Sequence, residues 1–516
     1  MDIEQFECSN DAKINSEQLI IHKKTKKKKG KFIIDSNKLV FSFIFFITII
    51  TFVILTKINN NNNNNTKTLE ANTKSDLVLE NECDIGYKLV DGKCVINYSF
   101  KATYVTYKDI EQINFTKTLS SEMIKEIIID EENTRINNKY IFQKKGKHIV
   151  YILLDMDKIE TLENMFSGII WLTSISFSEL FNSEKFKSMH SMFRNCKSLK
   201  SVDLSKLNTN NTINMDFLFS GCTALDSVDL SNFSNENLIS MNRLFFQCSS
   251  LELIDLTNFK TPKVENMSYA FAECDNLISL DLSGFDTKNA KNMRGLFDQC
   301  KSLTNVNIKH FEINNVIDMA YMFNKCEALK HLDTSKFHGP KVTTIKGMFY
   351  NCKSLISLDL SNFIGDSLTE MDNIFEGCVS LEAIDFSNFA PKKTLKSINY
   401  LFFFCTSLTY INLTNFRTEG VESMNGVFQG CSKLTSIDVS SFDTSKVNSM
   451  VDMFNGCTEL DKVDISNFDM NNIIYMTRMF DNCHKLSKHG IVINKDMIRK
   501  FERRIPDYYI SFQKMK

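Results

Sequence analysis

The chain between residues 199 and 204 reads LKSVDL, a leading Leu followed by a stretch in which apolar and polar residues alternate. Such alternation is typical of a short strand with one buried face. In the ten residues before Leu199, the apolar residues Met189, Phe193 and Cys196 are separated by four and three positions, as on one face of a short helical turn. The pattern predicts a unit made of one strand and one helical turn.

The same unit recurs at a fixed period, which its cysteines mark. They stand at Cys196, Cys222, Cys248, Cys274, Cys300, Cys326, Cys352, Cys378, Cys405, Cys431, Cys457 and Cys483. All intervals are equal, at twenty-six, except the one from Cys378 to Cys405, which is longer by one; every Cys has Phe three positions before it and Leu three positions after it. A degenerate first copy, with Leu162 and Phe166 in the Met and Phe roles, makes about thirteen units between residues 160 and 490.

A unit of this size cannot bury its apolar stripe alone, whereas stacking brings like positions into register and forms a continuous core. We therefore predict an α/β repeat fold for residues 161–490. The expected architecture is a leucine-rich-repeat solenoid whose parallel strands line one concave sheet.

Two units show the repeat sequence clearly: CDNLISLDLSGFDTKNAKNMRGLFDQ (274–299) and CSKLTSIDVSSFDTSKVNSMVDMFNG (431–456). These units resemble the BspA-like leucine-rich repeats of bacterial and protist surface proteins. The resemblance implies a solenoid in a cell-surface protein of adhesion or host-interaction type. The chain departs from the bacterial lipoprotein members because no lipidation Cys directly follows its apolar segment.

Both ends of the array are expected to be capped, because open ends would expose apolar surface and a strand edge. Residues 97–160 contain the strand-like runs FKATYVTY and HIVYILL, which predict a β-rich N-terminal cap. Residues 491–516 are predicted to form a C-terminal cap, with a helix over 495–505.

Residues 39–56 contain no charge in eighteen residues and would span roughly 27 Å as a helix. Eight Lys precede this segment and three follow it within twenty residues, which favours a cytoplasmic N-terminus. We expect a basic cytoplasmic tail (1–38), a single transmembrane anchor (39–56), an Asn-rich stem (57–82) and a small Cys-containing loop (83–96). The repeats would then be extracellular, as in a single-pass type II protein of the cell membrane.

The amino-acid composition excludes several classes of protein. Apolar residues at 43% and charged residues at 24% exclude wholesale disorder, a collagen-like rod and a polytopic membrane protein. The 61 basic residues are offset by 62 acidic ones, so no nucleic-acid partner is expected.

The repeated Cys position has three interpretations: a disulfide series, a metal ladder or small buried side chains. Strands stacked in register lie about 4.8 Å apart with parallel Cβ vectors, which suits a disulfide poorly. Zinc needs four converging ligands, and no His runs in phase with the cysteines. We expect structural core thiols and no metal site.

Cys83 and Cys94 lie outside the repeats, in the short polar segment CDIGYKLVDGKC. An extracytoplasmic setting favours oxidation of such a pair. We expect a local disulfide, with two free thiols as the alternative.

An acid or its amide stands between the two inward apolar residues of nearly every strand, where alternation points it toward solvent. The acids of this candidate ligand column are Asp203, Asp229, Asp255, Asp281, Asp333, Asp359, Asp385, Asp438 and Asp464. In one interpretation each carboxylate closes the turn after its strand by accepting backbone or hydroxyl hydrogen bonds. In the other, the column binds a cation or a basic protein ligand.

The residues that follow the strand and its turn vary from unit to unit, for example KTPK (260–263), HGPK (338–341) and RTEG (417–420). Repeated positions build the scaffold, so we expect specificity in these segments or at exposed strand positions.

We therefore expect a cell-surface binding module for an unknown protein ligand, such as an extracellular-matrix or cell-surface protein. The alternative is a structural or sensory surface receptor without an adhesive role. A more remote alternative is a type II glycosyltransferase, because YILLDMD (151–157) resembles its strand and DxD metal motif. The repeats begin within five residues of Asp157, and no P-loop, HExxH or GxSxG motif occurs, so no enzyme, catalytic residue or cofactor is predicted.

Overall fold

The computed structural model of this chain describes residues 83–90, 93–256, 258–387, 389, 391–487 and 490–494. The predicted tail (1–38), anchor (39–56), stem (57–82) and C-terminal helix (495–505) lie outside the described residues. Within the described ranges, no helix has the length and apolar character that a membrane crossing needs.

That finding corrects the predicted location in the cell membrane, with its cytoplasmic N-terminus and extracellular repeats. A membrane-spanning helix needs about 20 consecutive, mostly apolar residues. The helices among the described residues are two 3-10 helices of three residues each, η1 (Ser121–Met123) and η2 (Met156–Lys158).

The strands before the regular repeats are β1 (Tyr87–Val90), β2 (Lys93–Ile96), β3 (Phe100–Thr106), β4 (Glu111–Asn114), β5 (Ile124–Ile129), β6 (Glu132–Asn133), β7 (Lys139–Phe142), β8 (Gly146–Leu154) and β9 (Leu172–Phe177). Those of the array are β10 (Ser201–Asp203), β11 (Ser227–Asp229), β12 (Leu253–Asp255), β13 (Ser279–Asp281), β14 (Asn305–Asn307), β15 (Ser357–Asp359), β16 (Ala383–Asp385), β17 (Tyr410–Asn412), β18 (Ser436–Ile437), β19 (Lys462–Asp464) and β20 (Ile491–Val492).

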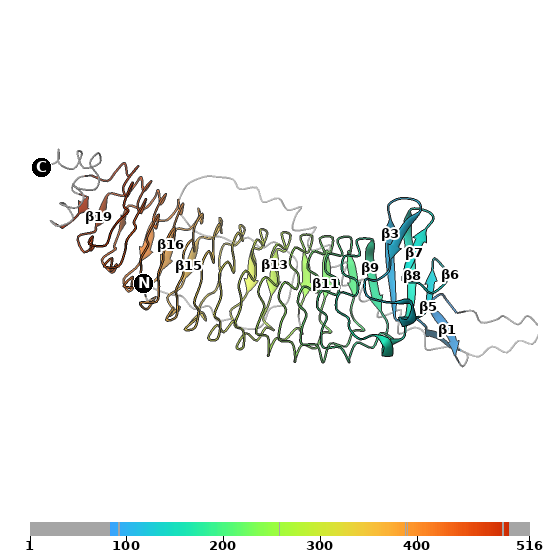
Figure 1. The fold of residues 1–516 in the computed structure, drawn as a ribbon. Helices are drawn as coiled ribbons and strands as arrows, with labels where there is room; N and C mark the ends of the chain where they lie inside the picture. The colour runs from blue at the N-terminus through green and yellow to red at the C-terminus, as the bar shows by residue number, and fades with distance from the viewer. Residues whose placement is uncertain are drawn as a thin grey trace, which may run out of the picture. The chain divides into compact units, whose positions relative to one another are not determined.

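The array is a parallel β-solenoid of about twelve turns, in which each turn stacks on the next with the predicted period. Ser279 lies opposite Asn305 and Asp281 opposite Asn307, so paired residues are one repeat apart. The predicted single sheet is present as short ladders of two or three strands, which follow one another along the stack in Figure 1. A second parallel column is made by isolated bridges that run from Ser188 to Tyr475.

The single longer interval in the array is absorbed in a loop. Ala383 in β16 pairs with Tyr410 in β17 without loss of register. Phe363 and Phe389 are one regular period apart, whereas the next buried pair, Leu368 and Leu395, is separated by one residue more. The extra residue therefore lies between Phe389 and Leu395, after the strand, where a longer loop costs little.

The side of each unit away from its strand is not helical, which corrects the α/β part of the predicted fold class. We call this side the turn wall: residues 189–199 and their equivalents in the other units. Cys196 donates its N–H three residues back to Phe193, at 3.1 Å, whereas Ser191 and Asn195 donate theirs to carbonyls of the next turn, at 2.9 and 2.7 Å. The wall is therefore a series of β-turns tied together across the units.

Left-handed residues explain why no α-helix forms in the wall. Ser191 and Asn195 have φ angles of 57° and 60°, and the equivalent pair of every later unit is also left-handed. Two left-handed residues four positions apart stop a right-handed helix from propagating.

The core between the two sides is a set of columns of identical residues. Thirteen Phe rings from Phe166 to Phe480 form one unbroken stack, with neighbouring centroids 5.2–5.9 Å apart and interplanar angles of 1–20°. Phe166 belongs to the degenerate first copy, so that copy packs as the sequence predicted. Each stacked pair adds about 0.5–1.5 kcal/mol beyond the burial of its apolar area.

The N-terminal cap reverses the direction of the strands. The sheet order is β10-β9-β3-β8-β5-β6; β9 pairs in parallel with β10, whereas β3 pairs antiparallel with both β9 and β8. Figure 1 shows β3 and β8 beside β9 at this end of the stack. The predicted strand runs at 100–107 and 148–154 are thus found as β3 and β8, and they cover the strand edge that the array would otherwise expose.

Candidate protein-binding face

We call the exposed side of strands β10–β19 the strand face. In β13, Ser279 and Asp281 are exposed and Leu280 between them is buried, as the alternation of the sequence predicts. Because the units repeat, the exposed first and third residues of successive strands form two parallel columns.

The predicted acid column follows the third-residue column of the strand face, with Asp333 and Asp438 at the same repeat position outside the strands. Its exposed members are Asp203, Asp229, Asp255, Asp281, Asp333, Asp359, Asp438 and Asp464, and Asp385 is half-buried. Asn307 and Asn412 occupy the same position in β14 and β17.

The column carboxylates also close the turns that follow the strands. The Oδ1 atom accepts the backbone N–H of the residue two positions later, at 2.6–3.0 Å, in Asp203, Asp229, Asp281, Asp333, Asp359, Asp385, Asp438 and Asp464. Hydrogen bonds from the backbone N–H and hydroxyl of that next Ser hold the pKa values of Asp281, Asp333, Asp438 and Asp464 below their usual value. These carboxylates therefore stay charged at neutral pH.

At β12 and β13, two exposed apolar side chains interrupt the polar strand face. Leu253 begins β12, where β10, β11 and β13 have Ser, and it is 69% exposed. Ile278, directly before β13, is 57% exposed. Beside Leu253 the face is hollowed, and the hollow is lined by Leu253, Ile254, Asp255, Leu256, Asp281, Ser283 and Gly284.

The same part of the strand face is acidic. Asp226 and Glu252 stand just before β11 and β12, and the acid column contributes Asp229, Asp255 and Asp281. No Lys or Arg occurs among residues 226–229, 252–255 and 278–281. We call these five carboxylates with Leu253 and Ile278 the acidic-apolar patch.

The sequence alone did not single out this patch. A signal was present, because Leu253 is a large apolar residue at a column position that is polar in most other units. A strand of one unit does not reveal that its exposed residue adjoins a hollow formed with the next.

The cysteines of the array lie in the core, and eleven of the twelve are buried; Cys483 is half-buried. Each thiol donates a hydrogen bond of 2.9–3.2 Å to the carbonyl of the stacked Phe in the preceding unit, as Cys300 does to Phe271. Burial raises the pKa of Cys196 and Cys378 to about 12, and that of Cys483 to about 11. Thiols in this state are poor nucleophiles and poor metal ligands.

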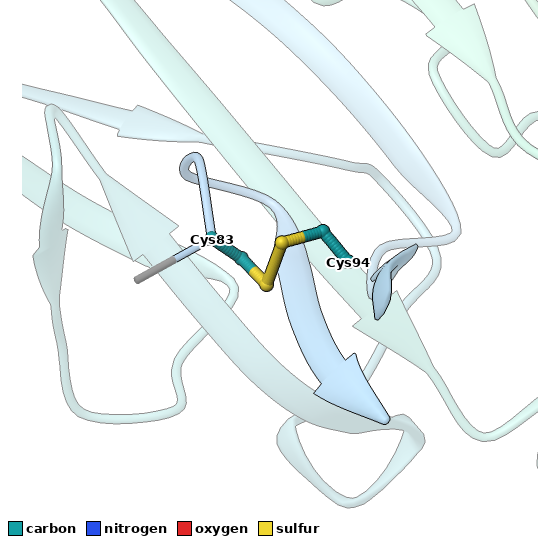
Figure 2. The surroundings of a disulfide bond; sticks show 2 residues. All are labelled: Cys83 and Cys94. Carbon is teal, nitrogen blue, oxygen red and sulfur yellow. A yellow bond between two sulfur atoms is a disulfide. The ribbon is translucent and has the colours of Figure 1, made fainter. Parts of the chain in front are cut away.

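Cys83 and Cys94, the pair that the sequence singled out, are joined by a disulfide with Cα atoms 5.4 Å apart. Figure 2 shows the bond between the chain just before β1 and strand β2. It links the segment before β1 to the beginning of β2, where Cys94 pairs with Leu89, and it lies outside the repeats.

The acids of the DxD-like sequence lie at the end of β8 and in η2. The Asp155 carboxylate lies 3.3 Å from the ammonium groups of both Lys125 and Lys158. Among the described residues, no three His, Cys, Asp or Glu side chains gather as they would around a metal ion. Nothing in this arrangement favours the glycosyltransferase alternative.

The variable segments after the strands are partly scaffold. Thr261 and Thr418, the second residues of KTPK and RTEG, are fully buried, and each donates its hydroxyl to a carbonyl of the next turn at 2.9 Å. Lys260, Lys263 and Arg417 beside them are exposed. Only the flanking residues of these segments are thus available to a partner.

A stack of short repeats with this core defines a leucine-rich-repeat solenoid, a fold typical of protein-interaction domains. The chain belongs to the family described as "Mycoplasma protein of unknown function, DUF285", whose model matches residues 160–279, 266–389 and 396–504. Its units are BspA-like leucine-rich repeats, as the repeat sequences predicted. No curated protein matches the chain.

Several solved structures are similar to this fold. A leucine-rich repeat protein from Bacteroides ovatus has 20% identity and a TM-score of 0.39, covering 74% of this chain and 92% of that chain. An internalin from Listeria monocytogenes has 13% identity and a TM-score of 0.21, covering 61% and 85%. A chain of the Toll–Spätzle complex of Drosophila has 16% identity and a TM-score of 0.23, covering 61% and 46%. Similarities at this level do not bear on function.

Proposed function

We propose that this protein is a binding module, not an enzyme, and that the acidic-apolar patch of its strand face holds a basic segment of a protein partner. The observation that carries the proposal is the meeting of five carboxylates with two exposed apolar side chains on one part of a rigid stack. Attachment to an extracellular-matrix or cell-surface protein is the specific form of the proposal.

The two kinds of side chain have different roles in this binding. Leu253 and Ile278 serve as anchors, because covering an exposed Leu or Ile contributes roughly 1–2 kcal/mol. The carboxylates speed the encounter with a basic partner and select against acidic ones. We favour a basic protein ligand over a metal cation because column carboxylates such as Asp281 already accept the N–H of their own turn.

The test uses the full chain and two synthetic ten-residue peptides as probes. One peptide has Lys and Arg around a central Leu, and the other has Glu in place of every basic residue. Fluorescence anisotropy should show binding of the basic peptide only, weakening as salt is added. Leu253→Ser should weaken this binding about 10-fold, because about 1.4 kcal/mol corresponds to a factor of ten.

Tyr410→Ser is the matched control, because Tyr410 occupies the same column as Leu253 and is 58% exposed, but lies in β17. Binding should be unchanged in this variant. Equal binding of the Glu peptide, or equal losses in the two variants, would contradict the proposal.

A further inference from the structure

Arg and aromatic side chains from six consecutive units alternate along the turn wall. We call this row the Arg–aromatic ladder; its members are Arg194, Phe217, Arg243, Tyr269, Arg294 and Tyr321. The turn wall lies on the side of the unit away from the strand, so the ladder is a different surface from the acidic-apolar patch.

The alternation is a chain of direct contacts. The guanidinium of Arg194 lies 4.9 Å from the centroid of the Phe217 ring, and that of Arg243 lies 5.4 Å from the same centroid. Arg243 also lies 4.8 Å from the Tyr269 ring. Cation–π contacts of this kind are worth about 0.5–2 kcal/mol each, so the row is held in one arrangement.

The contacts continue over the next two units. Arg294 donates its Nε–H to the Tyr269 hydroxyl at 3.1 Å, and its guanidinium lies 5.1 Å from the Tyr321 ring. Gly295 makes room for this packing, because a Cβ at that residue would lie 2.3 Å from the Tyr269 ring.

Four members of the ladder have a left-handed backbone conformation, which glycine would adopt without strain. Phe217, Arg243, Tyr269 and Tyr321 have φ angles of 54–60°, which non-glycine residues adopt at a cost. Other units have Gly at the equivalent position, as at Gly426. Retaining bulky residues at a strained backbone position indicates a role for their side chains.

The charge of the ladder is only partly balanced. Arg294 forms an ion pair with Asp318 at 3.2 Å. Within the described part of the chain, no carboxylate lies at ion-pair distance from Arg194 or Arg243, although both guanidiniums lie within 5.4 Å of the same ring. Asp216, next to Phe217 in the chain, accepts hydrogen bonds from Ser240 and Asn242 instead.

We propose that the Arg–aromatic ladder is a second docking surface, which takes an acidic, extended segment of a protein partner. Two carboxylates of that segment pair with Arg194 and Arg243, and bidentate guanidinium–carboxylate bonds are the strongest that these side chains form. The two Arg lie two turns apart, about 10 Å, so the partner carboxylates are two to four residues apart in an extended chain. Single-stranded nucleic acid fits less well, because the Phe217 and Tyr269 rings on which bases would stack already carry guanidiniums.

The test uses the full chain and three fluorescent probes: a ten-residue peptide rich in Glu, the same peptide with Gln for every Glu, and a ten-nucleotide oligo-dT. The Glu peptide should bind, with an affinity that falls as salt is added, and the Gln peptide should not. Arg243→Gln and Arg194→Gln should each weaken binding of the Glu peptide about 10-fold or more. Arg243→Lys should lose most of the affinity for the Glu peptide, because Lys keeps the charge but lacks the planar guanidinium that binds a carboxylate through two hydrogen bonds.

Arg478→Gln is the matched control. Arg478 occupies the same left-handed position as Arg243, with φ 57°, but forms an ion pair with Asp452 at 2.7 Å. This variant should bind the Glu peptide as the natural chain does, and Leu253→Ser should do so as well. If Arg243→Gln does not fold, Arg194→Gln still tests the proposal, because Arg194 is exposed.

Equal binding of the Gln peptide would overturn this proposal, as would tighter binding of oligo-dT or an equal loss in Arg478→Gln. The proposed basic ligand of the strand face would survive each of these results, because its probes and variants are different.

Discussion

The strand face and the turn wall come from the same repeating unit, but they shift the pKa of a carboxyl group in opposite directions. On the strand face, Asp281 accepts the N–H of Ser283, and its pKa is lowered. In the turn wall, burial raises the pKa of Asp298 to about 6, although Asn324 donates a hydrogen bond to it at 2.7 Å. The Asp281 carboxylate thus accepts hydrogen bonds from its own turn as well as from Asn307 of the next unit, whereas Asp298 is buried and bonds to its neighbouring unit.

The backbone conformation also differs between the strand face and the turn wall. On the strand face, residues are extended, and the turn after most strands is closed by an Asp of the same unit, as Asp281 closes its turn. In the turn wall, left-handed residues such as Ser191 direct their N–H groups into the next unit. The wall should therefore be the more sensitive side to substitution, and the strand face the more tolerant and more available to a partner.

The largest effect is expected for Phe297→Ala, behind the turn wall. Phe297 stacks on Phe271 and Phe323 at 5.8 and 5.2 Å, and its removal should lower the free energy of unfolding by about 3–5 kcal/mol. Leu253→Ser on the strand face should change it by less than about 0.5 kcal/mol. Urea unfolding followed by circular dichroism measures both, and similar losses would remove the contrast between the two sides.

A smaller effect is expected for Gly347→Ala in the turn wall. Gly347 has a φ of 58°, and a Cβ there would lie 2.6 Å from the Tyr321 ring, so the variant should lose about 1–3 kcal/mol. Gly456→Ala is the control: its φ is 79° and its nearest neighbour lies at 3.4 Å, so only the backbone cost of roughly 1 kcal/mol should remain. Thermal unfolding should also show partial rescue of Gly347→Ala by Tyr321→Ala; without rescue, the ring contact is not the cause.

On the strand face, Asp281→Ala should cost about 0.5–1.5 kcal/mol at pH 7, because it removes the acceptor of the Ser283 N–H. Asp281→Asn keeps an acceptor and should cost less. The pKa of Asp281 is lowered in the folded state, so its contribution is present above the ordinary value of 3.8 and is lost as pH falls through the folded pKa. Unfolding in urea at pH 7 and pH 3 should show the natural chain and the Ala variant converging at the lower pH.

A pH-dependent effect of the opposite sign is expected for Asp298. Its folded pKa of about 6 lies above the ordinary 3.8, so the folded state binds more protons between these values and stability falls as pH rises through this window. Asp298→Asn should remove that fall. Urea midpoints between pH 4 and pH 7 measure it, and parallel curves for the two proteins would contradict the assignment.

Much of the fold could be predicted from the spacing of residues. The period, the parallel register, the buried Cys and Phe columns and the strands of the cap follow from apolar patterns that recur unchanged. The exposed acid column followed in the same way, because Asp281 and its equivalents stand between inward-facing residues.

The turn wall could not be predicted, because offsets of four and three residues are shared by a helix and by a chain of β-turns. Glycine, the usual sign of a left-handed residue, is replaced at this position by residues as different as Ser191, Phe217 and Arg243. The Arg–aromatic ladder and the hollow beside Leu253 were hidden for a related reason, since their members are one or more units apart.

The sequence by itself determined the length of the repeat and which side chains are buried, because both depend on an apolar pattern within one unit. Only the tertiary structure decided the path of the turn wall and the neighbours of each exposed side chain. The physical reason is that the wall's N–H groups bond to carbonyls of the next unit, as Ser191 does to Asp216, and rings and guanidiniums likewise meet partners on the adjacent turn.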